Sequence, residues 1–207
     1  MKRLAGEPAI AAIILAAGSG TRFGAHKMLA AYAGRPLVAH VVAAVRQAGI
    51  DPITVVVPPD SGIVPALAGF PVVFAVNHAA ATGIASSIRT GVEALPAQAE
   101  AVLIALGDQP TVTSNYLRRL MAAHTASTAP ISASDYNGIL APPAIFDRSL
   151  FAELLALDGD RGARPVIDRE QGRVHRVRVA DRFEDIDTQE DLARLERRSD
   201  AGPGSMP

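Results

Sequence analysis

The stretch "LAAGSGTRFGAHK", residues 15–27, ends an apolar run with three glycines, one arginine and one lysine. The residues before it, "AIAAIILAA" at 9–17, are apolar throughout and predict a strand that helices cover on both faces. Glycines directly after such a strand let the backbone approach a ligand without side-chain collision. Because Arg22 and Lys27 are suited to phosphate oxygens, the stretch predicts a loop that holds a phosphate or a nucleotide.

Two common phosphate loops do not match this spacing. The dinucleotide fingerprint needs Gly-x-Gly-x-x-Gly, and here the glycines stand at 18, 20 and 24, one residue too wide. A Walker loop places its lysine directly after a glycine, whereas Lys27 follows His26. From the residues alone, the other interpretation is a tight strand-to-helix turn with two solvated cations.

Beyond this loop, short apolar segments alternate with helical periodicity, which is typical of an α/β domain with a mostly parallel sheet. The expected strands are 9–17, 53–57, 71–76, 101–106 and 173–179, and the expected helices begin near 36, 84, 113, 150 and 188. Asn137-Gly138 lies between two extended segments and indicates a small antiparallel element. We expect one Rossmann-like domain over residues 1–207, with a disordered tail from about 199 to 207.

The composition excludes several classes of protein. Twenty basic residues balance twenty-one acidic ones without forming a stripe, which argues against a nucleic-acid partner. The absence of cysteine excludes disulfides, thiolate zinc ligands and a cysteine nucleophile, and it suits the cytoplasm. The first apolar run ends at Gly18 and is too short to span a membrane. We therefore expect a cytoplasmic protein without a membrane partner.

Carboxylates follow the fourth strand and precede the last helix. "ALGDQP", residues 105–110, places Asp108 just past the carboxyl end of a buried strand, where ligands of open α/β sheets bind. Mg²⁺ takes one or two carboxylates together with substrate phosphate oxygens. The stretch "EDIDTQEDL", residues 184–192, offers candidates for a second carboxylate. Acidic residues also favour a helix start through its dipole, so the residues alone leave this choice open.

The loop as a whole, "LAAGSGTRFGAHKML", resembles the signature loop of nucleotidyltransferases. With "GDQP" and the stretch 142–167, residues 10–195 are similar to molybdenum cofactor cytidylyltransferases, whose fold is like that of nucleotide-diphospho-sugar transferases. The resemblance implies Arg22, Lys27 and Asp108 as catalytic residues. It also implies Asp108 and Asp187 as Mg²⁺ ligands, with Asp185 as the fallback.

The resemblance further implies which residues bind the two substrates. The nucleotide-binding residues would be Leu15, Ala16, Ala17, Gly18, Ser19, Gly20, Thr21, Arg22, Lys27, Ser87, Gly107 and Asp108. The turn "GDRGAR", residues 159–164, would place Asp160, Gly162 and Arg164 on the acceptor side. Structural packing of this turn is the other interpretation.

The implied reaction is transfer of CMP from CTP to the phosphate of a molybdopterin-type cofactor, with release of pyrophosphate. The product would pass to a molybdoenzyme or its chaperone. Ala17 favours CTP over GTP, which stays an alternative. Because Gly18-Ser19-Gly20-Thr21-Arg22 is closer to the sugar-nucleotide branch, a sugar phosphate or another small phosphorylated acceptor is also an alternative. A non-catalytic cofactor chaperone is less favoured, since a carrier needs no site for a metal and a triphosphate.

Overall fold

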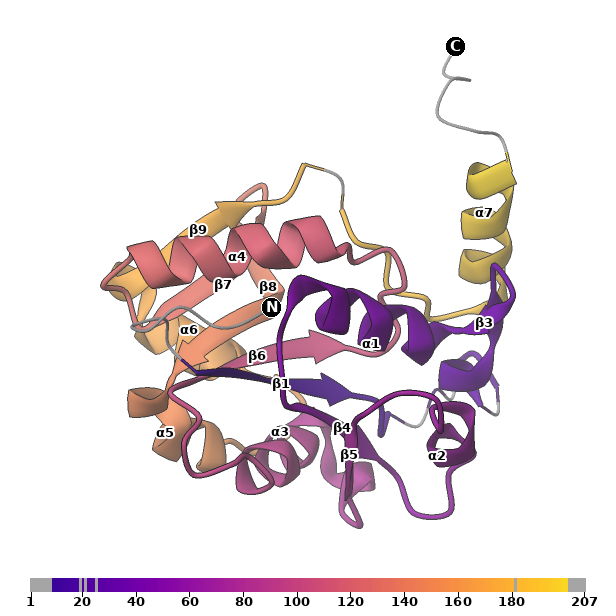
Figure 1. Ribbon diagram of the computed structural model, residues 1–207, viewed down its shortest axis with the longest axis horizontal. Coiled ribbons are helices and arrows are strands. Elements are labelled where there is room, and N and C mark those ends of the chain that lie inside the picture. Colours follow the sequence, from indigo (N-terminus) through magenta and orange to yellow (C-terminus); the bar gives the residue numbers. More distant parts are fainter. Residues whose placement is uncertain (1–8, 19, 21, 25, 181, 201–207) are drawn as a thin grey trace.

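The computed structural model describes residues 9–18, 20, 22–24, 26–180 and 182–200, and a seven-stranded sheet runs through them (Figure 1). The strand order is β5-β4-β1-β6-β8-β7-β9. The strands are β1 (Ile10–Leu15), β4 (Ile53–Val57), β5 (Val73–Val76), β6 (Ala101–Leu106), β7 (Ile131–Tyr136), β8 (Ile139–Asp147) and β9 (Val174–Arg178). The strands expected at 53–57 and 101–106 are confirmed with the same bounds, and the others are shorter at one or both ends.

The sheet is mostly parallel, which confirms the expected fold class. Strands β5, β4, β1 and β6 pair in parallel, and β9 pairs in parallel with β7. Only β8 among the described strands of this sheet runs against its neighbours β6 and β7. The turn at Asn137-Gly138 joins β7 to β8 with φ angles of 56° and 98°, as expected for a tight hairpin. A second, two-stranded antiparallel sheet pairs β2 (Ala31–Tyr32) with β3 (Arg35–Pro36).

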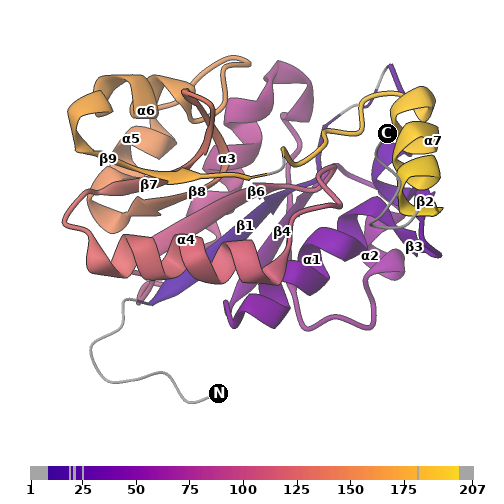
Figure 2. The same ribbon diagram turned by 90° about the horizontal axis from the view of Figure 1, so that it is seen from above.

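Helices cover both faces of the sheet (Figure 2). Helices α1 (Leu37–Ala48) and α4 (Ser114–Ala126) lie on one face, and α3 (Ile84–Glu93), α5 (Phe151–Leu155) and α6 (Arg164–Arg169) lie on the other. The short α2 (Ile63–Ala66) follows β4. The helix expected to begin near 113 is confirmed as α4, and Thr113 caps it, since its Oγ1 accepts a hydrogen bond from the Tyr116 amide at 3.2 Å. None of the described helices is both long and apolar enough to cross a membrane.

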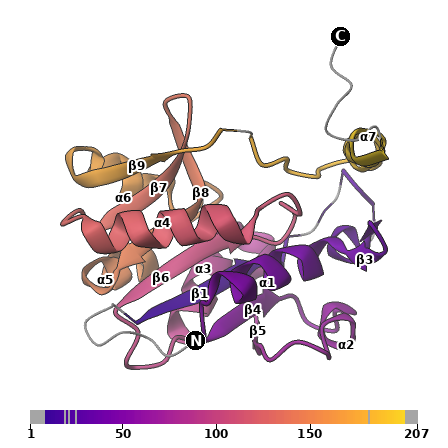
Figure 3. The same cartoon turned by 45° about the horizontal axis from the view of Figure 1, so that its top comes forward.

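The last helix, α7 (Gln189–Asp200), stands beside β2 and β3 (Figure 2) and away from the main sheet (Figure 3). It begins with a capping box, in which the Thr188 amide donates to Asp191 Oδ2 at 2.8 Å and the Asp191 amide donates to Thr188 Oγ1 at 3.1 Å. Hydrogen bonds from Thr188 hold the pKa of Asp191 at about 2. Since the helix continues to Asp200, the first two residues of the expected tail are helical, and 201–207 lie outside the described residues.

The buried His124 on α4 gives the fold a predictable response to acid. Its Nδ1 lies 3.2 Å from Ser132 Oγ, and burial lowers its pKa below 6.5, although Asp147 opposes this shift and His175 adds to it. The unfolded chain therefore takes up a proton before the native chain does, and the free energy of unfolding falls as the pH drops below about 6.5. In His124→Asn, urea unfolding measured from pH 7.5 to pH 5 should show a shallower fall than in the wild type. Identical slopes would contradict this role.

Candidate active site

The loop after β1 is held in a tight turn. The Gly20 carbonyl accepts hydrogen bonds from the amides of Phe23, at 2.9 Å, and Gly24, at 3.1 Å. Gly20 has a φ of +54°, and a Cβ there would lie 3.0 Å from the Cβ of Lys27, so both conformation and space favour glycine. This turn brings Lys27 back to the end of β1. Ser19 and Thr21, two of the expected nucleotide-binding residues, lie outside the described residues.

Lys27 contacts both of the carboxylates that the family resemblance implies as metal ligands. Its Nζ lies 2.7 Å from Asp108 Oδ2 and 2.7 Å from Asp187 Oδ1, although Asp187 is 160 residues away in the sequence. The Lys27 side chain is only 7% exposed. Burial lowers its pKa, but the two carboxylates outweigh that effect, so the pKa is raised and Lys27 is a cation at neutral pH.

A short segment without regular secondary structure carries Asp187 to Asp108. The Ile186 amide donates to the Asp108 carbonyl at 3.1 Å, and Gln109 Nε2 donates to Asp185 Oδ1 at 2.8 Å. Asp185 and Asp187 stand two residues apart in this segment, so Asp185 meets Gln109 while Asp187, further along, meets Lys27. The pKa of Asp185 is raised by burial, against the effect of the Gln109 hydrogen bond. The geometry thus favours Asp187 over the fallback Asp185 as the partner of Asp108.

The two carboxylates suit a divalent cation. Asp108 Oδ1 is buried and has no hydrogen-bond partner among the described residues, although a carboxylate oxygen in that position needs one. Asp108 Oδ2 and Asp187 Oδ1 already converge on one positive charge. Described residues form no cluster of three or more potential metal ligands, and Mg²⁺ needs only one or two carboxylates when phosphate oxygens supply the rest. The residues present therefore fit this ion.

Arg22 lies at the outer side of the same group. Its Nη1 is 3.8 Å from Asp187 Oδ2, and the side chain is 80% exposed. An exposed pair at this distance contributes little to stability, so Arg22 is available to an incoming anion. Arg22, Lys27, Asp108 and Asp187 thus lie together at the carboxyl ends of β1 and β6, where the Gly107 amide donates to the Leu15 carbonyl at 2.9 Å.

The remaining expected nucleotide contacts differ in their exposure. Ala16, Ala17 and Gly107 are buried, whereas Gly18 is exposed and a Cβ there would meet no atom within 4 Å. Ser87 is buried inside α3, and its Oγ accepts from Asn77 Nδ2 at 3.0 Å. Its contact with a base stays a prediction.

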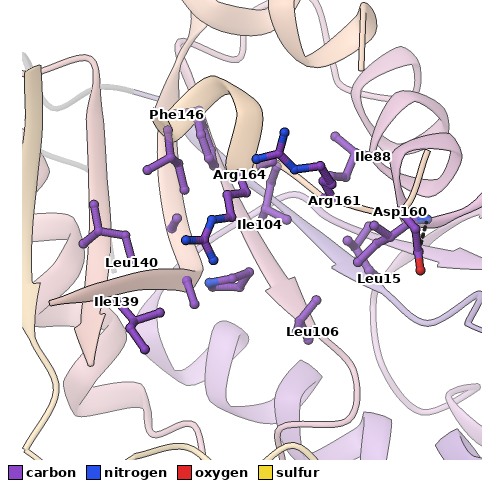
Figure 4. A pocket seen from close by; sticks show the side chains of 17 residues that line it. Leu15, Ile88, Ile104, Leu106, Ile139, Leu140, Phe146, Asp160, Arg161 and Arg164 are labelled. Carbon is purple, nitrogen blue, oxygen red and sulfur yellow. Dashed lines mark hydrogen bonds between the residues drawn. The ribbon is translucent and has the colours of Figure 1, made fainter. Parts of the chain in front are cut away.

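The expected acceptor residues gather at one cavity of about 260 Å³ (Figure 4). Asp160, Gly162 and Arg164 line it, together with Leu15 and Leu106 from the ends of β1 and β6. The turn that carries them is fixed to the start of α3.

Two contacts fix this turn. Asp160 Oδ1 accepts from the Ile84 amide at 3.2 Å, and the Gly159 carbonyl accepts from the Ala85 amide at 3.2 Å. Asp160 therefore has a packing role as well as a place at the cavity.

Two residues of the site had no assigned role in the sequence analysis. Arg161 lines the same cavity. The sequence could have indicated it, because it places a positive charge directly after Asp160. Gln109 is buried and positions the segment of Asp187 through Asp185. It belongs to "GDQP", but a glutamine after an aspartate carries no distinctive signal of its own.

Comparison with known proteins agrees with this fold. The MobA-like NTP transferase domain matches residues 12–176, and the chain belongs to this family. The Rv0371c protein of Mycobacterium tuberculosis H37Rv has a similar structure, with a TM-score of 0.81 and 28% identity over 92% of this chain and 99% of that one. A second structure of that protein, in complex with manganese, gives a TM-score of 0.75 with 27% identity over 92% and 98% of the two chains. Family membership supports nucleotidyltransferase activity.

Curated relatives carry more than one activity in their names. Nicotine blue oxidoreductase of Paenarthrobacter nicotinovorans is 30% identical over 91% of this chain and 97% of its own length. The bifunctional protein GlmU of Kineococcus radiotolerans is 32% identical over 95% of this chain, which spans 41% of that protein. The substrates are therefore argued from the site.

Proposed function

We propose that this protein transfers CMP from CTP to the phosphate of a molybdopterin-type cofactor and releases pyrophosphate, with Asp108 and Asp187 as Mg²⁺ ligands. The observation that carries the proposal is the convergence of Asp108 and Asp187 on Lys27 at 2.7 Å each, directly beside the glycine loop. A protein that only carries a cofactor has no need for two carboxylates and two cations at a phosphate loop. The choice of CTP and of the pterin rests on the sequence resemblance.

The chain's own residues support transfer by position and charge. The glycine loop leaves room for the nucleotide, and Arg22 and Lys27 donate to its phosphate oxygens. An oxygen of the acceptor phosphate attacks the α-phosphorus in line. The bond from that phosphorus to the bridging oxygen then breaks, and pyrophosphate leaves with the electron pair. Bound Mg²⁺ supplies additional positive charge to the phosphate oxygens. Loss of one such charged contact costs about 3 kcal/mol, or about a hundredfold in rate.

Pyrophosphate release with each of the four ribonucleoside triphosphates, Mg²⁺ and molybdopterin tests the proposal. We expect release with CTP only. Release with GTP alone would overturn the nucleotide assignment, and release that needs a sugar phosphate in place of molybdopterin would overturn the acceptor. If no triphosphate raises the melting temperature or yields pyrophosphate, the interpretation of the loop at residues 15–27 is wrong. Pyrophosphate release also distinguishes nucleotidyl transfer from an oxidation–reduction reaction, which releases no pyrophosphate.

A further inference from the structure

A small apolar cluster joins the glycine loop to the last helix. This group, the clasp, is formed by Phe23, Leu37, Ile186 and Leu195, all of which are buried. Phe23 belongs to the loop, Leu37 begins α1 and Leu195 belongs to α7. The two main cores on the faces of the sheet contain no described residue of α7. The clasp is therefore the place where this helix packs onto the rest of the described chain.

Two members of the clasp are direct sequence neighbours of candidate site residues. Phe23 follows Arg22, and Ile186 precedes Asp187. The side chains of Phe23 and Ile186 pack into the clasp, whereas Arg22 and Asp187 are exposed and lie 3.8 Å apart, from Nη1 to Oδ2. Close packing of a side chain fixes the backbone that carries it, and with it the start of the next side chain. The clasp therefore determines where Arg22 and Asp187 stand relative to each other.

Polar contacts at the surface also attach α7. Tyr32 Oη lies 2.7 Å from Ser199 Oγ, and the exposed Arg198 forms an ion pair with Glu184. Surface ion pairs contribute little to stability. Leu195 is the only buried residue of α7 that the structure describes. Since the helix stands beside β2 and β3 (Figure 2) and away from the main sheet (Figure 3), its docking depends mainly on this leucine.

We infer that Phe23 and Leu195 are positioning residues: docking of α7 into the clasp holds Arg22 and Asp187 in the arrangement that binds the nucleotide phosphates and the metal. Both side chains are buried in the clasp and act through their neighbours. When α7 leaves the clasp, the loop and Asp187 lose a common support, and the affinity for both ligands falls. By thermodynamic linkage, bound ligands favour the docked helix to the same extent. This inference rests on the proposed function for the identity of the ligands, but the coupling of helix and loop is measured without them.

Hydrogen exchange of single amides, measured by NMR without nucleotide or metal, tests this coupling. The reporters are the amides of Phe23, which donates to the Gly20 carbonyl at 2.9 Å, and of Ile186, which donates to the Asp108 carbonyl at 3.1 Å. In Leu195→Ala both should exchange at least about tenfold faster, because weaker docking opens the loop and the segment together. Leu195→Met keeps most of the side-chain volume and should restore slow exchange.

Two control variants separate this coupling from a general loss of stability. Leu154→Ala removes a buried leucine of α5 from a main core, and it should speed the exchange of β6 amides rather than that of the Ile186 amide. Glu196→Ala, at an exposed position of α7, should change neither. In Leu195→Ala the β6 amides should keep their wild-type rates. The double variant Phe23→Ala/Leu195→Ala should open the Ile186 amide little more than either single variant, because both remove the same contact.

Mn²⁺ titration, followed by electron paramagnetic resonance, measures the effect on the site. Phe23→Ala and Leu195→Ala should each weaken Mn²⁺ binding on the order of tenfold and raise the KM for CTP. The value of kcat at saturating Mn²⁺ and CTP should change far less, because the bound ligands restore docking. A purely structural contact would not produce this division between KM and kcat.

Three outcomes are decisive. Wild-type exchange of the Phe23 and Ile186 amides in Leu195→Ala would overturn the inference. Fast exchange with wild-type Mn²⁺ affinity in both alanine variants would overturn the positioning role. If exchange changes as expected but the wild type binds no Mn²⁺, the metal ligands of the proposed function are wrong, and the coupling of α7 to the loop stands.

Discussion

Asp108→Asn is expected to lower kcat for pyrophosphate release by about a hundredfold to a thousandfold while the protein remains folded. The substitution keeps the shape of the side chain but removes its charge from Lys27 at 2.7 Å and from the buried Oδ1 that has no partner among the described residues. In other enzymes, removing one charged or hydrogen-bonding group that is held in place for the transition state lowers kcat by a similar factor. Steady-state kinetics and the melting temperature together measure the effect.

A metal-binding readout separates this role from a structural one. Titration with Mn²⁺, followed by electron paramagnetic resonance, should show weaker binding in Asp108→Asn and in Asp187→Asn than in the wild type. Asp51→Asn, at an exposed position before β4, is the matched control and should behave as the wild type does. Near-normal turnover in Asp108→Asn would remove Asp108 from the catalytic residues.

Lys27→Met is expected to have two separable effects. The variant keeps a side chain of similar length but leaves Asp108 and Asp187 facing each other without the ammonium group. Without metal, the free energy of unfolding should fall on the order of 2 kcal/mol, because a largely buried carboxylate loses its charged partner. The value of kcat/KM for CTP should fall about a hundredfold, because the triphosphate also loses a cation.

Added divalent cation should restore the stability of Lys27→Met but not its activity. Urea unfolding with and without millimolar Mn²⁺ measures this, and the cation should stabilise the variant more than the wild type because it binds only the folded site. Arg46→Met, at an exposed position near the end of α1, is the control for loss of a cation. Equal stabilities of Lys27→Met and wild type in metal-free buffer would show that the Lys27 ion pairs contribute nothing to the fold.

The strongest local patterns predicted most of the fold. The runs at 53–57 and 101–106 match β4 and β6 because these strands are covered on both faces, which leaves Thr54 as the one polar residue within them. Helix α6 was missed, since its six residues are too few to show a helical period. The hairpin of β2 and β3 was missed for the same reason, because two-residue strands have no alternation to read.

The residues of the candidate site could be proposed from the sequence, but the contacts among them could not. The loop and Asp108 follow strands whose carboxyl ends meet at one edge, so their proximity follows from topology. The choice between Asp185 and Asp187 depends on which of them reaches Lys27, and only the ion pair of Asp187 with Lys27 and the hydrogen bond from Gln109 to Asp185 decide it. The buried Ser87 is hydrogen-bonded to Asn77, which lies just after β5, and this contact between a loop and a helix has no signal in the sequence.

The long separation between Lys27 and Asp187 has a consequence for how the protein matures. The main sheet is complete at Arg178, but the carboxylate that pairs with Lys27 comes later in the chain. During synthesis the sheet can gather its strands while the site still lacks one of its two carboxylates. The growing chain can therefore acquire its shape before it acquires both carboxylates. On the proposed function, a ribosome-bound intermediate that stops short of Asp187 would hold Asp108 without the second metal ligand.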